Sequence, residues 1–218
     1  MNRREFVQTA AFAAAAAFSI PTFLRAAAEK KEIGLQLYSL RDVIMKDPKG
    51  VLKQVASFGY TELETFGYRA GNIFGMTAKD FAEYVKSLGM RIVSGHYTMD
   101  IVRGDWERTV ADAKMMGQQY VVMPWLVEQE RSPEAIMKVC EELNKAGEIA
   151  NKYGLRMGYH NHDFEFKEAN GTVLYDTMLK ELDPKLVGME MDIFWVVYAG
   201  FDPFAYFENI PAASNSGT

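Results

Sequence analysis

Residues 87–96 read Ser-Leu-Gly-Met-Arg-Ile-Val-Ser-Gly-His: the end of a helical stretch, a glycine, and then a short apolar strand. Gly89 suits the left-handed position that closes a helix, because a Cβ is penalised in that conformation. The same order recurs around Gly59, Gly117 and Gly154, at spacings of 30, 28 and 37 residues. Each spacing is the length of one strand, one helix and two turns, so the chain repeats a helix–strand unit.

Capping signals place the helix starts between the strands. Asp47, Ser132 and Asp202 each precede a proline, and Thr77 lies three residues before Asp80. A short polar side chain before proline is typical of a helix start, and the spacing of Thr77 and Asp80 is that of a capping box. Six strands are expected between these helices, at residues 33–40, 61–64, 91–96, 120–125, 155–160 and 187–192.

Alternation of apolar strands with helices favours a parallel sheet whose outer face the helices cover. Such a sheet is either doubly wound or closed into a TIM barrel. No Gly-x-Gly-x-x-Gly or P-loop follows the first strand, so the nucleotide-binding doubly wound fold loses its main support. We therefore expect an α/β fold, an incomplete TIM (β/α)8 barrel with about six βα units present.

The composition is that of an ordinary globular domain. Of 218 residues, 49% are apolar and 24% are charged, and the formal net charge is −5. An acidic balance argues against a general nucleic-acid binder, which needs a basic face to neutralise phosphates. Cys140 is the only cysteine, so the sequence allows no intrachain disulfide and no thiolate zinc cluster. We expect Cys140 to be buried in a helix.

The first 28 residues have the pattern of an export signal. Arg3 and Arg4 precede an apolar run from Phe6 to Ile20, and small residues follow at 26–28. The start resembles a twin-arginine signal, and a general secretory signal is the alternative. The apolar run is shorter than the roughly 20 residues of a membrane span. We expect a periplasmic or otherwise exported protein, without a stable membrane anchor after cleavage of the signal.

Polar and aromatic residues gather at the ends of the expected strands. All three histidines lie there, together with acids, a glutamine and aromatic residues: His96, His160, His162, Gln36, Tyr38, Glu64, Trp125, Glu190, Asp192 and Trp195. In a barrel these strand ends form one rim, which holds the active site. Residues two apart in a strand point the same way, so His160 and His162 share a direction. Imidazole and carboxylate together suit Mn, Zn, Co or Mg.

Structural roles compete with each of these assignments. His96 could bond a neighbouring loop, Glu64 could sit in a salt bridge, and Asp192 could cap a helix. Glu165, in the loop after the fifth strand, could be a solvated charge. The two tryptophans could belong to the core as readily as to a sugar-stacking wall.

At these residues the chain resembles the xylose isomerase-like TIM-barrel superfamily, in its exported sugar phosphate isomerase/epimerase branch. Tyr-His-Asn-His-Asp-Phe-Glu-Phe at 159–166 is the most specific stretch; the others are 34–41, 59–64, 94–96, 123–126 and 189–195. The resemblance covers residues 33 to 208. It implies a metal held by side chains from strands 5, 6, 7 and 8. His160 stands where relatives have Glu, with Glu165 as an alternative, and strand 6 offers Asp192.

The resemblance also gives an expectation about length. Strands 7 and 8 do not follow in this sequence, although roughly 80 more residues are expected for the fold. We expect domains at 1–28 for the signal and 29–208 for the partial barrel, with an irregular tail at 209–218. On this interpretation the chain is truncated, and two metal ligands lie outside it.

The resemblance implies a metal-dependent sugar isomerase or epimerase that moves a proton next to a carbonyl. His160 and Asp192 would hold the divalent metal, and His162 and Glu165 are the catalytic candidates. The sugar would contact Gln36, Tyr38, Glu64, His96, Trp125 and Trp195. A 3-keto-sugar lyase or hydratase and a non-catalytic truncated sugar-binding barrel are the alternatives. Cleavage of abasic DNA is disfavoured by the acidic charge and the leader, so a small-molecule sugar is the expected partner. The oligomeric state stays open.

Overall fold

A computed structural model describes residues 32–169 and 171–209 of the chain. The predicted leader at residues 1–28 lies outside these residues, as does the tail after position 209. Within them, six parallel strands alternate with helices, as the sequence predicts. The six strands of this sheet are β1 (Gly34–Gln36), β2 (Glu62–Thr65), β5 (Arg91–His96), β6 (Tyr120–Met123), β7 (Arg156–His160) and β10 (Val187–Glu190).

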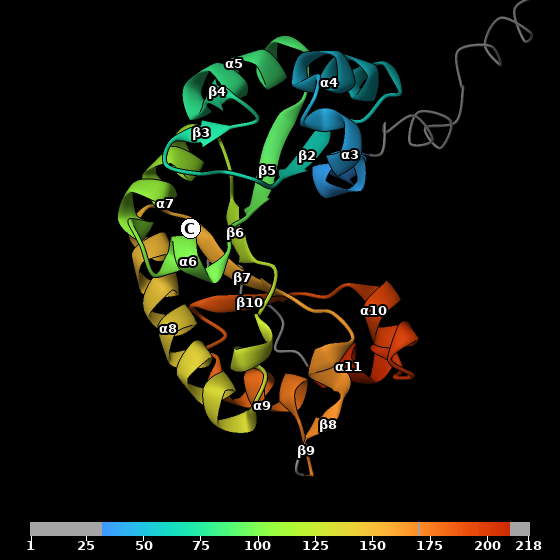
Figure 1. Ribbon diagram of the computed structural model, residues 1–218, viewed down its shortest axis with the longest axis vertical. Helices are drawn as coiled ribbons and strands as arrows, with labels where there is room; N and C mark the ends of the chain where they lie inside the picture. The colour runs from blue at the N-terminus through green and yellow to red at the C-terminus, as the bar shows by residue number, and fades with distance from the viewer. Residues whose placement is uncertain (1–31, 170, 210–218) are drawn as a thin grey trace, which may run out of the picture. The chain divides into compact units, whose positions relative to one another are not determined.

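The order of strands in the sheet decides between the two architectures left open by the sequence. The order is β1-β2-β5-β6-β7-β10, so each strand pairs with the next one in the chain, and every pair is parallel. A doubly wound sheet reverses its order near the middle. Winding in one direction puts the crossover helices on one face, as Figure 1 shows, which is the arrangement of a partial TIM barrel.

Long helices cover the outer face of the sheet, and shorter elements fill the connections. The covering helices are α4 (Pro48–Ser57), α5 (Ala78–Ser87), α7 (Trp106–Met115), α8 (Pro133–Lys152) and α9 (Leu174–Glu181). The shorter elements are η1 (Leu37–Leu40), α3 (Arg41–Ile44), α6 (Met99–Val102), η2 (Glu128–Glu130), η3 (Phe164–Phe166), α10 (Ile193–Tyr198) and α11 (Pro203–Asn209), with two hairpins, β3 (Asn72–Ile73) with β4 (Met76–Thr77) and β8 (Glu168–Ala169) with β9 (Thr172–Val173). In the part of the chain that the structure describes, no helix combines the length and apolar character needed to cross a membrane.

The helix boundaries follow the predicted signals. Gly89 has a φ of 76° and Gly154 a φ of 69°, the left-handed conformation that the sequence assigns to them. At the helix starts, the side chains of Asp47, Ser132 and Thr77 each accept a hydrogen bond from the backbone N–H three residues later. These bonds satisfy amides that have no partner inside the helix.

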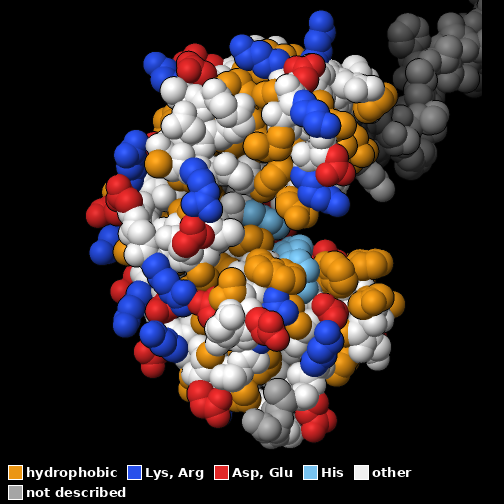
Figure 2. Space-filling model, in the orientation of Figure 1, with side chains coloured by type: hydrophobic (Ala, Val, Ile, Leu, Met, Phe, Trp, Pro, Cys, Tyr) orange, Lys and Arg blue, Asp and Glu red, His pale blue; other side chains and the backbone are white. Residues whose placement is uncertain are grey.

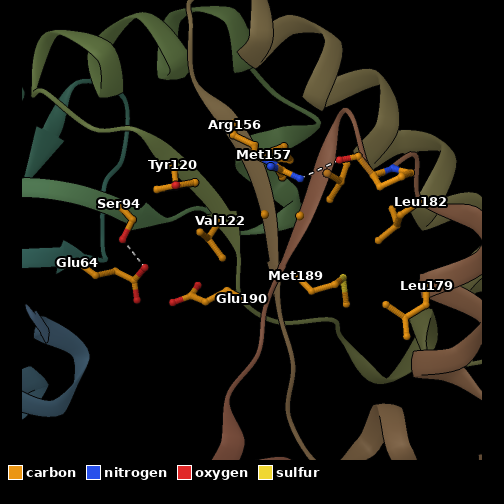
Figure 3. Close-up of a pocket in the computed structure, with 14 residues that line it drawn as sticks. Glu64, Ser94, Tyr120, Val122, Arg156, Met157, Leu179, Leu182, Met189 and Glu190 are labelled. Carbon is orange, nitrogen blue, oxygen red and sulfur yellow. Dashed lines mark hydrogen bonds between the residues drawn. The ribbon is translucent and has the colours of Figure 1, made fainter. Parts of the chain in front are cut away.

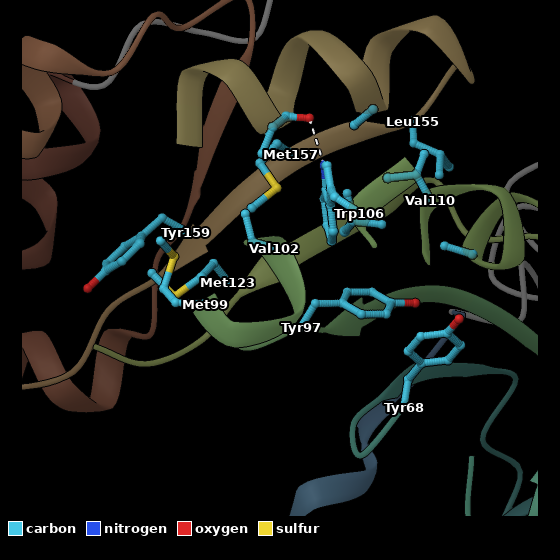
Figure 4. Packing of buried hydrophobic residues seen from close by; sticks show 14 of the residues in the cluster. Tyr68, Tyr97, Met99, Val102, Trp106, Val110, Met123, Leu155, Met157 and Tyr159 are labelled. Carbon is cyan, nitrogen blue, oxygen red and sulfur yellow. Dashed lines mark hydrogen bonds between the residues drawn. The ribbon is translucent and has the colours of Figure 1, made fainter. Parts of the chain in front are cut away.

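The main core lies between the sheet and its helices. Met157 and Tyr159 of β7 are fully buried there, and Figure 4 shows them in one cluster with Trp106, whose indole Nε1 donates to the carbonyl of Ala146 in α8 at 3.0 Å. Cys140 is buried in the same layer, as predicted. Because side chains alternate along a strand, burying Tyr159 outward directs His160 to the concave face.

Three of the predicted strands end earlier in the structure, each for a local reason. The first ends at Gln36, because the Gln36 side chain accepts a hydrogen bond from the Tyr38 amide at 2.8 Å and starts the 3-10 helix η1. The fourth ends at Met123, just before Pro124, which has no N–H to extend the ladder. The sixth ends at Glu190, since Asp192 caps helix α10.

Candidate functional site

The carboxyl ends of the parallel strands form one rim of the sheet, and the chemically active side chains gather there. This rim and the opening that it surrounds are called the mouth. In the sheet, Gln36 pairs with Glu64, and Glu190 pairs with His160. His96 ends β5 between them. Figure 2 shows histidine side chains in the hollow of the visible face. The predicted gathering of imidazoles and acids at a single rim is therefore present in the structure.

His96 lies between two carboxylates. Its Nε2 is 3.1 Å from Glu64 Oε1 and 3.4 Å from Glu190 Oε2. Burial opposes protonation of this imidazole, but hydrogen bonds to Glu190 and Glu64 raise the pKa of His96 to about 9. Burial likewise opposes ionisation of Glu64, yet the hydrogen bond and charge of His96 lower its pKa to about 2. The pair is thus ionised at neutral pH when no ion is bound.

Further hydrogen bonds fix the Glu64 carboxylate. Gln36 Nε2 donates to Glu64 Oε1 at 2.6 Å, and Ser94 Oγ donates to Oε2. Burial raises the pKa of Glu190, and the neighbouring charge of Glu64 adds to this shift. The two acids beside His96 therefore differ: Glu64 is a fixed anion, whereas Glu190, with a side chain that is 37% exposed, can reach the mouth.

His160 has the properties of a side chain that is available to bind a metal ion. Burial, with the nearby His96 and His162, lowers its pKa to about 4, so the ring is neutral at pH 7. Its Nδ1 is buried without a hydrogen-bond partner and lies 3.8 Å from Glu190 Oε2. The ring centroids of His160 and His96 are 5.0 Å apart. One ligand atom each from His96, His160 and Glu190 lies within 4.8 Å of the others.

Asp192 stands on the other side of the His160 ring. Its Oδ2 is 3.7 Å from His160 Nε2, while its Oδ1 accepts from the amides of Phe194 and Trp195 at the start of α10. The side chain of Asn161 binds the Asp192 backbone through two hydrogen bonds. The carboxylate that the sequence assigns to the metal is therefore also the cap of a helix.

His162 is enclosed by aromatic rings. Its ring centroid lies 4.7 Å from Trp125, edge to face, and 5.3 Å from Trp195. Burial lowers the pKa of His162. The guanidinium of Arg131 sits over Trp125, with Cζ 4.4 Å from the ring centroid, and over Phe164 at 3.7 Å. The result is a neutral imidazole in an apolar, partly open corner of the mouth.

Glu165 lies apart from the mouth. It is fully buried, with Oε1 accepting from the Tyr159 hydroxyl at 2.6 Å and Oε2 accepting from the His162 amide at 2.8 Å. Tyr159 belongs to the outward side of β7, so this carboxylate faces the layer between sheet and helices. Burial raises the pKa of Glu165 to about 7. Through these two hydrogen bonds, Glu165 anchors the loop after β7.

A cavity of about 440 Å³ borders the mouth, a size typical of ligand pockets. Figure 3 shows Glu64, Ser94 and Glu190 around it, with Val122 and Met189 supplying apolar walls. The lining continues past these residues to the amino ends of β6 and β7 and to helix α9, and it includes no histidine and no tryptophan. The reactive groups are at the mouth, so the mouth is the candidate site.

The model of the family described as "Xylose isomerase-like TIM barrel" matches residues 52–215. The chain belongs to this family. Two solved structures of sugar phosphate isomerase/epimerases from Parabacteroides distasonis are similar to it. One is 33% identical, with a TM-score of 0.74, and the match covers 85% of this chain and 73% of that one. The other is 31% identical, with a TM-score of 0.73 and coverage of 82% and 74%.

The inosose dehydratase of Lactiplantibacillus plantarum is a curated relative of this chain. It is 43% identical over 58 residues, which is 25% of this chain and 18% of the relative. The matched stretch thus spans less than a fifth of that protein's length.

The residues at the mouth fit a divalent cation. The observation that supports this fit is the Nδ1 of His160, which is buried without a hydrogen-bond partner. An imidazole nitrogen without a hydrogen bond is costly to bury, and a metal ion would satisfy its lone pair. Two neutral nitrogens and one carboxylate oxygen form a donor set suited to Zn, Mn or Co. Binding at His96 must displace its proton, because only the neutral ring is a ligand.

The predicted site residues divide into three groups in the structure. Those gathered at the mouth are Gln36, Glu64, His96, Trp125, His160, His162, Asp192 and Trp195. Tyr38 is 53% exposed and packs edge to face on Phe66, and its contact with the sugar stays a prediction. Glu165 is turned into the protein. Pairing His160 with Asp192 as ligands stays a prediction, since the triad within ligand range pairs His160 with His96 and Glu190 instead.

Glu190 and Asn161 were not chosen as site residues from the sequence. Glu190 points in the same direction as Asp192 in the predicted strand, so the sequence alone predicts its position at the rim. Asn161 lies between two histidines that point inward. Because side chains alternate along a strand, Asn161 is expected to point away from the mouth. Only its contact with Asp192, which follows β10 and caps α10, shows its importance.

Proposed function

We propose that this chain binds a divalent metal ion and moves a proton next to the carbonyl of a sugar, as a sugar isomerase or epimerase. The observation that carries the proposal is the triad of His96, His160 and Glu190, whose ligand atoms lie within 4.8 Å of one another at the mouth. The similarity to sugar phosphate isomerase/epimerases supports the choice of substrate class.

His96, His160 and Glu190 would hold the ion. When bound, a divalent ion supplies Lewis acidity, which polarises the sugar carbonyl and acidifies the hydrogen on the neighbouring carbon. Asp192, beside the other ring nitrogen of His160, would orient that imidazole, as carboxylates do for metal-bound histidines.

His162 is our candidate for the group that accepts the proton. Its lowered pKa keeps the ring neutral at pH 7, so that a lone pair is available. Trp125 and Trp195 flank it with apolar surface on which the face of a sugar ring can stack. Gln36 and the ionised Glu64 provide hydrogen-bonding groups for hydroxyls deeper in the mouth.

A dehydratase that acts on keto sugars is the second candidate, and the match to an inosose dehydratase favours it. Its first step is the same removal of a proton beside a carbonyl. The reactions then diverge: return of the proton gives an isomer or epimer, and loss of a hydroxide as water gives an unsaturated product.

Deuterium exchange tests the proposal. The full chain, loaded with Co²⁺, Mn²⁺, Zn²⁺ or Mg²⁺, is incubated in D₂O with keto and aldo sugars, and the products are examined by NMR. We expect deuterium on the carbon beside the carbonyl, and we expect His160→Gln to abolish the exchange. Glu142→Gln, in an exposed ion pair with Arg103, is the control. Absence of exchange with every metal and sugar would refute proton transfer, and release of water would favour the dehydratase.

A further inference from the structure

Asn161 joins the two strand ends that carry the site. Its side chain is fully buried between the positions of His160 and His162. Its Nδ2 donates to the carbonyl of Asp192 at 3.2 Å, and its Oδ1 accepts from the Asp192 amide at 2.9 Å. Pairing of β7 with β10 ends at His160 and Glu190, so the side chain of Asn161 continues the connection where the backbone ladder stops.

The same contact fixes the direction of the Asp192 carboxylate. Two hydrogen bonds hold its backbone, and Oδ1 is held by the amides of Phe194 and Trp195. Oδ2 is the oxygen left to face the mouth, 3.7 Å from Nε2 of His160. Neither the chain nor the carboxyl group of Asp192 can turn without breaking these bonds.

We propose that Asn161 is a positioning residue that sets the Asp192 carboxylate opposite His160 and thereby orients this imidazole for the metal. The inference rests on the proposed function, because it assigns the reason for the geometry to metal binding. Groups that orient a metal-bound histidine typically contribute about 10–100-fold to metal affinity. Asn161 itself touches neither the ion nor the sugar in this arrangement.

The chain contains a matched control. Asn144 in α8 makes a comparable pair of bonds to the backbone of two residues: its Nδ2 donates to the carbonyl of Glu181 at 3.0 Å, and its Oδ1 accepts from the Asp183 amide at 2.9 Å. This contact precedes β10 and therefore lies at the opposite end of the strand from Asp192. Removing it takes away two equivalent hydrogen bonds without altering the mouth.

The experiment compares Asn161→Ala with Asn144→Ala in the full chain. Co²⁺ affinity is measured by calorimetry and by the absorption spectrum of the bound ion, and exchange of the Asp192 amide is measured by NMR without metal. We expect Asn161→Ala to weaken Co²⁺ binding by about 10–100-fold and to speed exchange at Asp192. We expect Asn144→Ala to leave the affinity and that amide as in the unaltered protein.

Each outcome decides the proposal. Unchanged Co²⁺ affinity in a folded Asn161→Ala protein would overturn it, and so would an equal loss in Asn144→Ala. If the unaltered protein binds no Co²⁺, the proposed function fails, and amide exchange alone then decides whether Asn161 holds Asp192. Should Asn161→Ala not fold, Asn161→Asp replaces it, because it keeps the shape and the acceptor but removes the donor to the Asp192 carbonyl.

Discussion

Glu165 is a buried acid whose ionisation acts on the fold. Burial raises its pKa from 4.5 to about 7, so the folded protein holds the proton more tightly than the unfolded chain. Its contribution to stability is therefore present below pH 4.5 and is lost as the pH rises through 7, a change of about 3 kcal/mol. The free energy of unfolding of Glu165→Gln should therefore increase relative to that of the wild type by about the same 3 kcal/mol as the pH rises.

Urea denaturation of both proteins from pH 4 to 8 measures this difference, with Glu83→Gln on the exposed surface of α5 as the control for loss of a charge. A difference in unfolding free energy that stays constant with pH would contradict the prediction.

The sequence predicted the residue types of the site better than their directions. His96, His160 and His162 follow the alternation of strands, and the structure places them at the mouth as expected. Glu165 follows a strand by five residues, where the 3-10 helix η3 interrupts the period of two. Its direction depends on the Tyr159 hydroxyl and the His162 amide, contacts that no local pattern contains.

At the scale of elements, the connection between β6 and α8 is organised around Arg131. Its Nε and Nη2 donate to the carbonyl of Leu126 at 3.0 and 2.8 Å, while its plane lies over Trp125 and Phe164. Lys has neither the planar fork nor the stacking surface. Arg131→Lys should loosen Trp125 and raise the KM for the proposed sugar substrate by about 2- to 30-fold, since a cation–π contact contributes ~0.5–2 kcal/mol, with little change in kcat.

Steady-state kinetics measures this split, with Arg103→Lys as the control, because Arg103 holds the same connection through an ion pair with Glu130. An equal rise of KM in both variants would show that the loop as a whole, and not the stacked guanidinium, is responsible.

Element boundaries were predicted where a backbone rule sets them. The strand at 91–96 and the positive φ of Gly89 agree with the sequence, because helix closure needs a residue without a Cβ. The first strand was predicted too long, since an apolar run does not reveal that the Gln36 side chain captures the Tyr38 amide. The strand order, by contrast, follows from the repeated unit and its single direction of winding.

For the whole molecule, a metal ion at the triad would link three strands, since its ligands come from β5, β7 and β10. Binding only to the folded state stabilises it by about 2.7 kcal/mol at an ion concentration 100 times the Kd. Because His96 has a pKa of about 9, binding releases its proton, and the stabilisation should grow as the pH rises from 7 to 9.

Thermal unfolding with Zn²⁺ or Co²⁺, and again after chelation, measures this stabilisation. The increase in melting temperature should disappear with the chelator and in Glu190→Gln, while Glu142→Gln, an acid on α8 that pairs with Arg103, should retain it. Glu190→Gln tests the geometry most directly, because it keeps the size of the side chain and removes the anionic ligand beside both imidazoles. Full stabilisation of Glu190→Gln by metal would move the ion away from this triad and toward the pair of His160 and Asp192.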